Sequence, residues 1–225
     1  KKFDVAVGLA LHEGSHIKLS DFNLLRHLES SIPQEIYVLA EKLNVQRHEV
    51  ISTVKNILNY VEDRRIDSYI FRTSPGYKSY YHAMYDKYFY SKNVDKGLLS
   101  SEFRMENIES YMFRIINLHN KNRQLGALKG LKEIYETIDL GRIQKGLCRD
   151  TNEAFNIACD VMSIILLNID PIVVQDDSDS DDSQSQDGDS SEENSDSQEG
   201  NGSGDSSTIS DEELQDMLDS DSIVP

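Results

Sequence analysis

The acidic residues of this chain gather at one end, and this segregation limits what the chain can fold into. Residues 171–225 contain 18 Asp and Glu and no Lys or Arg, and most of the others are Ser, Gly, Asn or Gln. Such a segment has too few apolar side chains to form a core. Residues 1–170 hold the other 22 acidic residues and all 23 basic ones. The sequence therefore predicts one globular domain over 1–170 and a disordered acidic segment over 171–225.

Apolar residues in 1–170 recur at α-helical spacing almost throughout, and no stretch alternates as a half-buried strand does. We therefore expect a mainly α-helical domain. Two helix starts have a local cause: Ser20 precedes Asp21 as a capping hydroxyl, and Pro33 suits a first helical turn. The expected helices span 4–19, 21–30, 33–43, 46–71, 76–90, 105–117, 125–139 and 151–168.

Composition also excludes several classes of partner. Residues 1–170 lack the concentrated positive charge that phosphate neutralisation needs, so we expect no nucleic-acid partner. No run of 18 apolar residues is present, so we expect no membrane span. Cys148 and Cys159 lie in a helix-like region, which favours free thiols in a reducing compartment. The chain opens at Lys1 directly on a periodic apolar segment, as an internal fragment of a longer protein would.

One part of the acidic segment keeps apolar residues, and these are Ile209, Leu214, Met217 and Leu218. Ser210, with Glu213 three residues later, forms a capping-box pattern at its start. One interpretation is a short helix over 210–219 that folds on a partner, and the other is a transient helix in a linker.

The motif that carries chemistry is His12-Glu13-Gly14-Ser15-His16, an H-E-x-x-H pattern inside an apolar run. Successive helical residues turn by about 100°, so the two histidines lie about 40° apart and can share a metal ion. Glu13 lies about 100° from His12, beside the metal, where it can act as a general base in the manner of zinc peptidases. The alternative is a pair of polar residues at a domain edge.

Two glycines in this helix need a reason, because each costs up to about 1 kcal/mol relative to Ala. They are Gly8 and Gly14. We interpret them as room for the close approach of another backbone to the metal helix.

A catalytic zinc usually has three protein ligands, and the acidic and basic run 59–67 is the best source of the third. Projection at about 100° per residue places Glu62 at the edge of an apolar stripe, so Glu62 is the expected ligand. Asp63 is the second choice, because Asp63 and Asp67 have the spacing in which one carboxylate binds metal and the other orients a histidine. Arg65 projects into the stripe and should pair with a buried carboxylate or bind a substrate. A solvated, salt-bridged helix face is the alternative.

Six of the eleven tyrosines lie between residues 77 and 90. Their helical spacing predicts amphipathic packing with hydroxyls at the rim. The functional alternative is that one of them, with Tyr81 as the candidate, or His82 donates a hydrogen bond to the oxyanion of a tetrahedral intermediate.

The segments 9–16 and 61–67, followed by the acidic stretch, resemble the N-terminal part of predicted zinc metallopeptidases that carry a von Willebrand factor A domain. These proteins are known from bacteria and tailed phages and are distantly similar to the CobT subunit of cobaltochelatase. The resemblance implies a zincin-like helical domain with a Zn²⁺ cofactor and a peptide or protein substrate. It also implies His12 and His16 as ligands, Glu13 as base and Glu62 as third ligand.

The motif and the resemblance together suggest two functions. The leading one is a zinc-dependent peptidase of the gluzincin type, in the cytoplasm or, for a phage protein, in the host cytoplasm. The resemblance implies that the acidic segment links it to a C-terminal von Willebrand factor A domain. The alternative is a non-catalytic CobT-like assembly or chaperone module that docks a partner such as an AAA+ ATPase. A structural metal site closed by a fourth protein ligand would distinguish the second from the first.

Overall fold

The computed structural model describes residues 2–171. The chain divides into two units, Lys1–Gln175 and Asp176–Pro225, and every described residue belongs to the first. The described part is mainly helical, which confirms the expected fold class, and it contains no strand. None of its helices is both long and apolar enough to cross a membrane. The acidic tail and the expected helix at 210–219 lie outside the described residues and stay predictions.

Eleven α-helices and one 3₁₀ turn make up the described part. They are α1 (Lys2–Leu19), α2 (Phe22–Arg26), α3 (Leu28–Ser31), α4 (Gln34–Lys42), α5 (Arg47–Thr73), η1 (Pro75–Tyr77), α6 (Lys78–Tyr88), α7 (Lys92–Leu99), α8 (Ile108–Ile116), α9 (Leu131–Ile138), α10 (Leu140–Gln144) and α11 (Thr151–Asn168).

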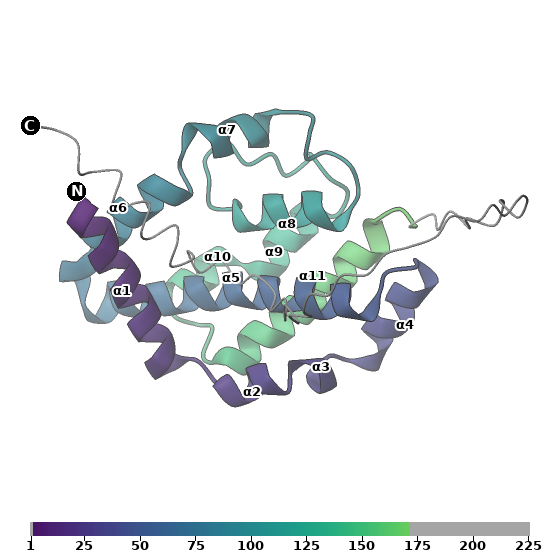
Figure 1. Cartoon of the computed structure of the whole chain (residues 1–225), viewed down its shortest axis with the longest axis horizontal. Helices are drawn as coiled ribbons and strands as arrows, with labels where there is room; N and C mark the ends of the chain where they lie inside the picture. Colours follow the sequence, from purple (N-terminus) through teal and green to yellow (C-terminus); the bar gives the residue numbers. More distant parts are fainter. Residues whose placement is uncertain (1, 172–225) are drawn as a thin grey trace, which may run out of the picture. The chain divides into compact units, whose positions relative to one another are not determined.

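The long helix α5 runs through the middle of this unit, and the other helices gather around it (Figure 1). It packs most extensively on α11 and also contacts α1, α4, α8 and α10. The apolar stripe read from the sequence of α5 faces inward, with no member more than 1% exposed: Val50, Val54, Ile57, Leu58 and Val61. Burial of this stripe fixes which way the polar residues of α5 point, and so it positions the site described below.

Helix starts follow local capping chemistry, with one departure from expectation. The side chain of Asp21 accepts hydrogen bonds from the backbone N–H groups of Asn23 and Leu24 and caps α2. Ser20, expected as this cap, lies one residue too early and directs its hydroxyl elsewhere. At α11 the side chain of Asp150 caps in the same way as Asp21. These caps satisfy N–H groups that a helix leaves unpaired in its first turn.

The structure also differs from the expected helices in four places. The helix expected over 21–30 is interrupted at His27, and α7 and α10 were not expected at all. The helix expected from residue 125 begins only at Leu131. The residue before it, Gly130, has a φ of +69°, and a Cβ there would lie 2.6 Å from Asn168 Nδ2. Glycine is therefore favoured at this turn, and the backbone is not helical before it.

A second, smaller apolar cluster joins α1 and α5 to α6. Its buried members are Tyr81, Met84 and Tyr85. At Gly8 of α1 an added Cβ would lie 2.5 Å from the Tyr80 carbonyl oxygen of α6. The close backbone approach expected in this helix therefore occurs at Gly8, whereas nothing lies within 4 Å of a Cβ at Gly14.

Candidate metal centre

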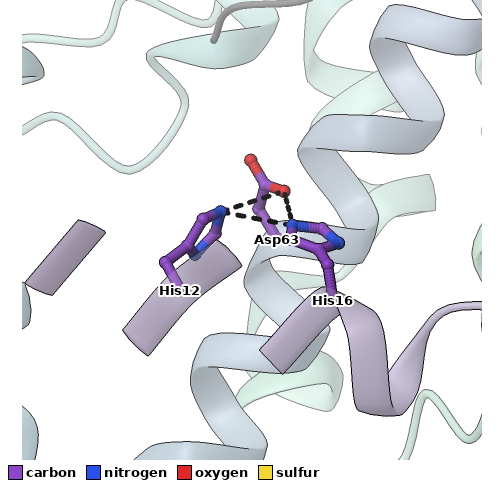
Figure 2. A group of neighbouring side chains, drawn as sticks. All are labelled: His12, His16 and Asp63. Atoms are coloured by element: carbon purple, nitrogen blue, oxygen red, sulfur yellow. Dashed lines mark hydrogen bonds and ion pairs between the residues drawn. The ribbon is translucent and has the colours of Figure 1, made fainter. Parts of the chain in front are cut away.

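Three side chains from two helices converge on one point, as Figure 2 shows. His12 and His16 lie one turn apart on α1, and their Nε2 atoms are 3.3 Å from each other. Asp63 comes from α5, and its Oδ1 lies 3.5 Å from Nε2 of His12 and 3.2 Å from Nε2 of His16. Three potential ligand atoms within 4.8 Å of one another could hold a metal ion. Two imidazole nitrogens and a carboxylate oxygen form a ligand set that suits Zn²⁺.

The other nitrogen of each imidazole is held by a separate partner. Nδ1 of His12 lies 3.0 Å from Oδ1 of Asp67, one turn beyond Asp63 on α5. Nδ1 of His16 lies 3.0 Å from Oγ of Ser20. When Nδ1 of each ring carries the hydrogen, both Nε2 lone pairs face the point shared with Asp63. Partners of this kind orient metal-binding histidines.

The electrostatics of the group favour a cation at its centre. Burial alone would lower the pKa of His12, but hydrogen bonds to Asp63 and Asp67 outweigh burial and raise that pKa to about 10. Burial would raise the pKa of Asp63, but the hydrogen bond from His12 and the positive charges of His12 and Arg64 bring it below its usual range. Without a metal ion, a proton on His12 therefore supplies the positive charge between these groups. A divalent cation can replace that proton.

One side of the group is accessible to solvent. The side chains of His16 and Asp63 are 21% and 26% exposed, and that of His12 is 11% exposed. Within residues 2–171, these three side chains form the whole group of potential ligands. A catalytic metal keeps a position open for water or substrate, whereas a structural zinc has four protein ligands.

Glu62, the expected third ligand, does not join this group. The residue is 4% exposed, and its carboxylate forms a bidentate ion pair with Arg65, at 2.6 and 2.8 Å. Its Oε1 also accepts hydrogen bonds from Ser20 and Thr151, each at 2.9 Å. Adjacent helical residues point about 100° apart, so α5 can present only one of Glu62 and Asp63 to the histidines. The structure presents Asp63, the second choice from the sequence.

The remaining expected residues fall in different places. Arg65 pairs with the buried Glu62 carboxylate, one of its two expected roles, and also donates to the Leu19 carbonyl. Asp67 contacts His12, as its spacing from Asp63 suggested. Glu13 follows His12 on α1 and is exposed to solvent. It is therefore available to a substrate, and it takes no part in the buried contacts of the group.

Of the two expected oxyanion donors, only Tyr81 lies beside the histidines. Its ring centroid is 6.4 Å from that of His12, and its side chain has no exposed surface. Burial raises the pKa of Tyr81 to about 12. His82 is exposed, and its ring stacks on Phe71 instead. A hydrogen-bond donor to a substrate must be accessible, and the buried Tyr81 packs against His12 instead. His82 is accessible, but its ring contacts Phe71 and not the two histidines of the group.

Two residues that the sequence patterns did not assign to the site complete its surroundings. Ser20 lies four residues after His16, a spacing that places both on one helical face. Arg64 places Nη2 3.4 Å from Oδ2 of Asp67 and its guanidinium 4.7 Å from the ring centre of Tyr85. The spacing of Ser20 from His16 was a readable signal, whereas the place of Arg64 depends on how α5 and α6 pack.

Compared with known protein families, curated proteins and solved structures, the chain matches none of them. The site is therefore interpreted from its own geometry.

Proposed function

We propose that this domain is a zinc-dependent hydrolase that cleaves peptide bonds. The observation that carries the proposal is the convergence of His12, His16 and Asp63 on one point with a solvent-accessible side. The H-E-x-x-H pattern and the resemblance to predicted zinc metallopeptidases supply the expected substrate class, a peptide or protein.

Each residue has a separate role in this proposal. His12, His16 and Asp63 hold the ion, while Asp67 keeps the His12 ring oriented. When bound, zinc would act as a Lewis acid that polarises a carbonyl group and lowers the pKa of water. Glu13, exposed and adjacent to His12, accepts the proton of the attacking water and delivers it to the leaving amine.

Metal content and cleavage must be measured together to test this proposal. The purified chain should bind one zinc ion and cleave a fluorescein-labelled unfolded protein such as casein. His16→Ala should remove both properties, whereas Glu13→Gln should keep the zinc and lose cleavage by at least about 100-fold, the lower end of the contribution expected of a general base. Glu41→Gln, at an exposed glutamate of α4, is the matched control and should behave as the wild type.

Two results would overturn the proposal in different ways. A protein that takes up no zinc lacks the metal site altogether. If the wild type and Glu13→Gln both bind zinc and neither cleaves the labelled protein, the result would support the non-catalytic assembly module with a partner such as an AAA+ ATPase.

A further inference from the structure

The contacts of Ser20 assign a direction to the hydrogen bond that holds His16. The Ser20 hydroxyl has one hydrogen and two neighbours, Oε1 of Glu62 at 2.9 Å and Nδ1 of His16 at 3.0 Å. The Glu62 carboxylate, paired with Arg65, can only accept. The hydroxyl hydrogen therefore points to Glu62, and the hydroxyl oxygen accepts the hydrogen bond from His16.

This arrangement leaves His16 one useful tautomer. A hydrogen on Nδ1 satisfies Ser20 and leaves a lone pair on Nε2, which lies 3.3 Å from Nε2 of His12 and can accept a hydrogen bond from the protonated His12 ring. The opposite tautomer would place a hydrogen on Nε2 and leave Nδ1 facing a hydroxyl that donates elsewhere. It would also block the nitrogen that binds a metal.

We propose that Ser20 is a positioning residue for the metal centre. The buried Glu62 carboxylate takes the hydroxyl hydrogen of Ser20, so the Ser20 oxygen can only accept a hydrogen bond from Nδ1 of His16. This inference deepens the proposed function and rests on it for its role in metal binding. Glu62, which the sequence suggested as a ligand, thereby acts on the metal through two intervening side chains. The same side chains also hold the C-terminal end of α1 to α5. Ser20 donates to Glu62, and Arg65 donates to the Leu19 carbonyl.

The chain offers a matched control for this proposal. Thr151, at the start of α11, donates a hydrogen bond of the same length, 2.9 Å, to the same Glu62 oxygen. Its hydroxyl also accepts from the backbone N–H of Asp21, but neither contact reaches His16. Thr151→Val therefore removes one hydrogen bond to Glu62, as Ser20→Ala does, and also the one from the Asp21 N–H. It removes no contact with His16.

The first measurement follows the His16 ring in the metal-free protein by long-range ¹⁵N–¹H correlation at neutral pH, with signals assigned through His16→Gln. The wild type, Thr151→Val and Ser20→Thr should all show His16 as the Nδ1–H tautomer. Ser20→Ala should populate the Nε2–H tautomer. An unchanged tautomer in Ser20→Ala would overturn the proposal, whether or not the protein binds a metal.

The second measurement is zinc affinity by competition with a chelator. Ser20→Ala should weaken binding by about 10–100-fold, the usual cost of losing a partner that orients a metal-binding histidine. Thr151→Val should stay within about threefold of the wild type although it lowers the melting temperature, and Ser20→Thr should restore binding. Equal losses in Ser20→Ala and Thr151→Val would overturn the proposal in favour of a purely structural role. Absence of zinc binding in the wild type would instead count against the proposed function, and the tautomer would still decide the role of Ser20.

Discussion

The rings of His12 and His119 are both largely shielded from solvent, but neighbouring groups shift their pKa values in opposite directions. His12 lies between the carboxylates of Asp63 and Asp67, which overcome its burial and raise its pKa to about 10. His119 has both ring nitrogens buried, with no hydrogen-bond partner among the described residues. Burial, aided by the charge of Arg64, lowers its pKa to about 4.

The surroundings of His119 are aromatic. Its ring lies 5.5 to 6.4 Å, centre to centre, from four others, those of Tyr60, Tyr85, Phe89 and Tyr90. These rings pack against the imidazole, but no hydroxyl among them lies within hydrogen-bond distance of its nitrogens. The comparison shows that burial alone favours a neutral histidine, whereas carboxylates placed at both nitrogens create a site that holds a proton or a metal.

The largest expected difference between the two regions is in metal binding. His12→Ala should weaken zinc binding by more than about 100-fold, because loss of a ligand should exceed the 10–100-fold cost of losing a residue that only orients one. His119→Ala should leave one zinc bound with wild-type affinity. Competition with a chelator measures both, and equal effects of the two substitutions would contradict the assignment of the metal centre.

Acid unfolding should depend on His119. Its pKa is about 4 in the folded protein and about 6.5 in an unfolded chain, so the unfolded state binds more protons between these values. The free energy of unfolding should therefore fall as the pH falls from about 6.5 to 4, by about 2–3 kcal/mol from this residue.

The measurement is urea unfolding of metal-free protein at several pH values. His119→Phe should remove this part of the pH dependence, and His48→Gln, at an exposed histidine, should keep it. The same slope in the wild type and His119→Phe would contradict the prediction.

The helix α6 contributes to both regions, since Tyr81 lies beside His12 and Tyr85 beside His119. Gly8→Ala should push α1 away from α6, because its Cβ would meet the Tyr80 carbonyl oxygen. We expect a loss of about 1–3 kcal/mol in unfolding free energy. Gly14→Ala meets nothing and should gain up to about 1 kcal/mol from helix propensity. Thermal unfolding of both variants tests this, and it fails if Gly8→Ala is as stable as Gly14→Ala.

The smallest effect concerns the proton on His12. Because the pKa of His12 is about 10 without metal, zinc must displace a proton at neutral pH, so affinity should rise about tenfold per pH unit between pH 7 and 8. Calorimetry in buffers of different ionisation enthalpy should count about one proton released per zinc. Asp67→Asn, which removes one of the two carboxylates, should release less than one. Binding that does not change with pH would contradict this role of His12.

Much of the fold followed from local patterns, because helical spacing and capping residues act within a few positions. The apolar stripe of α5 is buried as its spacing predicts, and the long helices α1, α4, α5, α6 and α11 occur close to their expected ranges. The short helices α7 and α10 were missed, because each contains an internal glycine, Gly97 or Gly141, and only two or three apolar residues. The start of α9 was placed too early, because Gly130, which precedes the helix, has a left-handed backbone that helical periodicity does not reveal.

For the candidate site, the sequence by itself determined that His12 and His16 share a face of α1, because the spacing of four residues is a property of any helix. It also determined that Asp63 and Asp67 share a face of α5. Only the tertiary structure decided which carboxylate meets the histidines. Glu62 and Asp63 are neighbours in the chain, but the packing of α1 and α11 around α5 leaves Asp63 toward α1 and Glu62 among Ser20, Arg65 and Thr151. That choice depends on contacts across 42 to 89 residues of sequence, which helical periodicity does not contain.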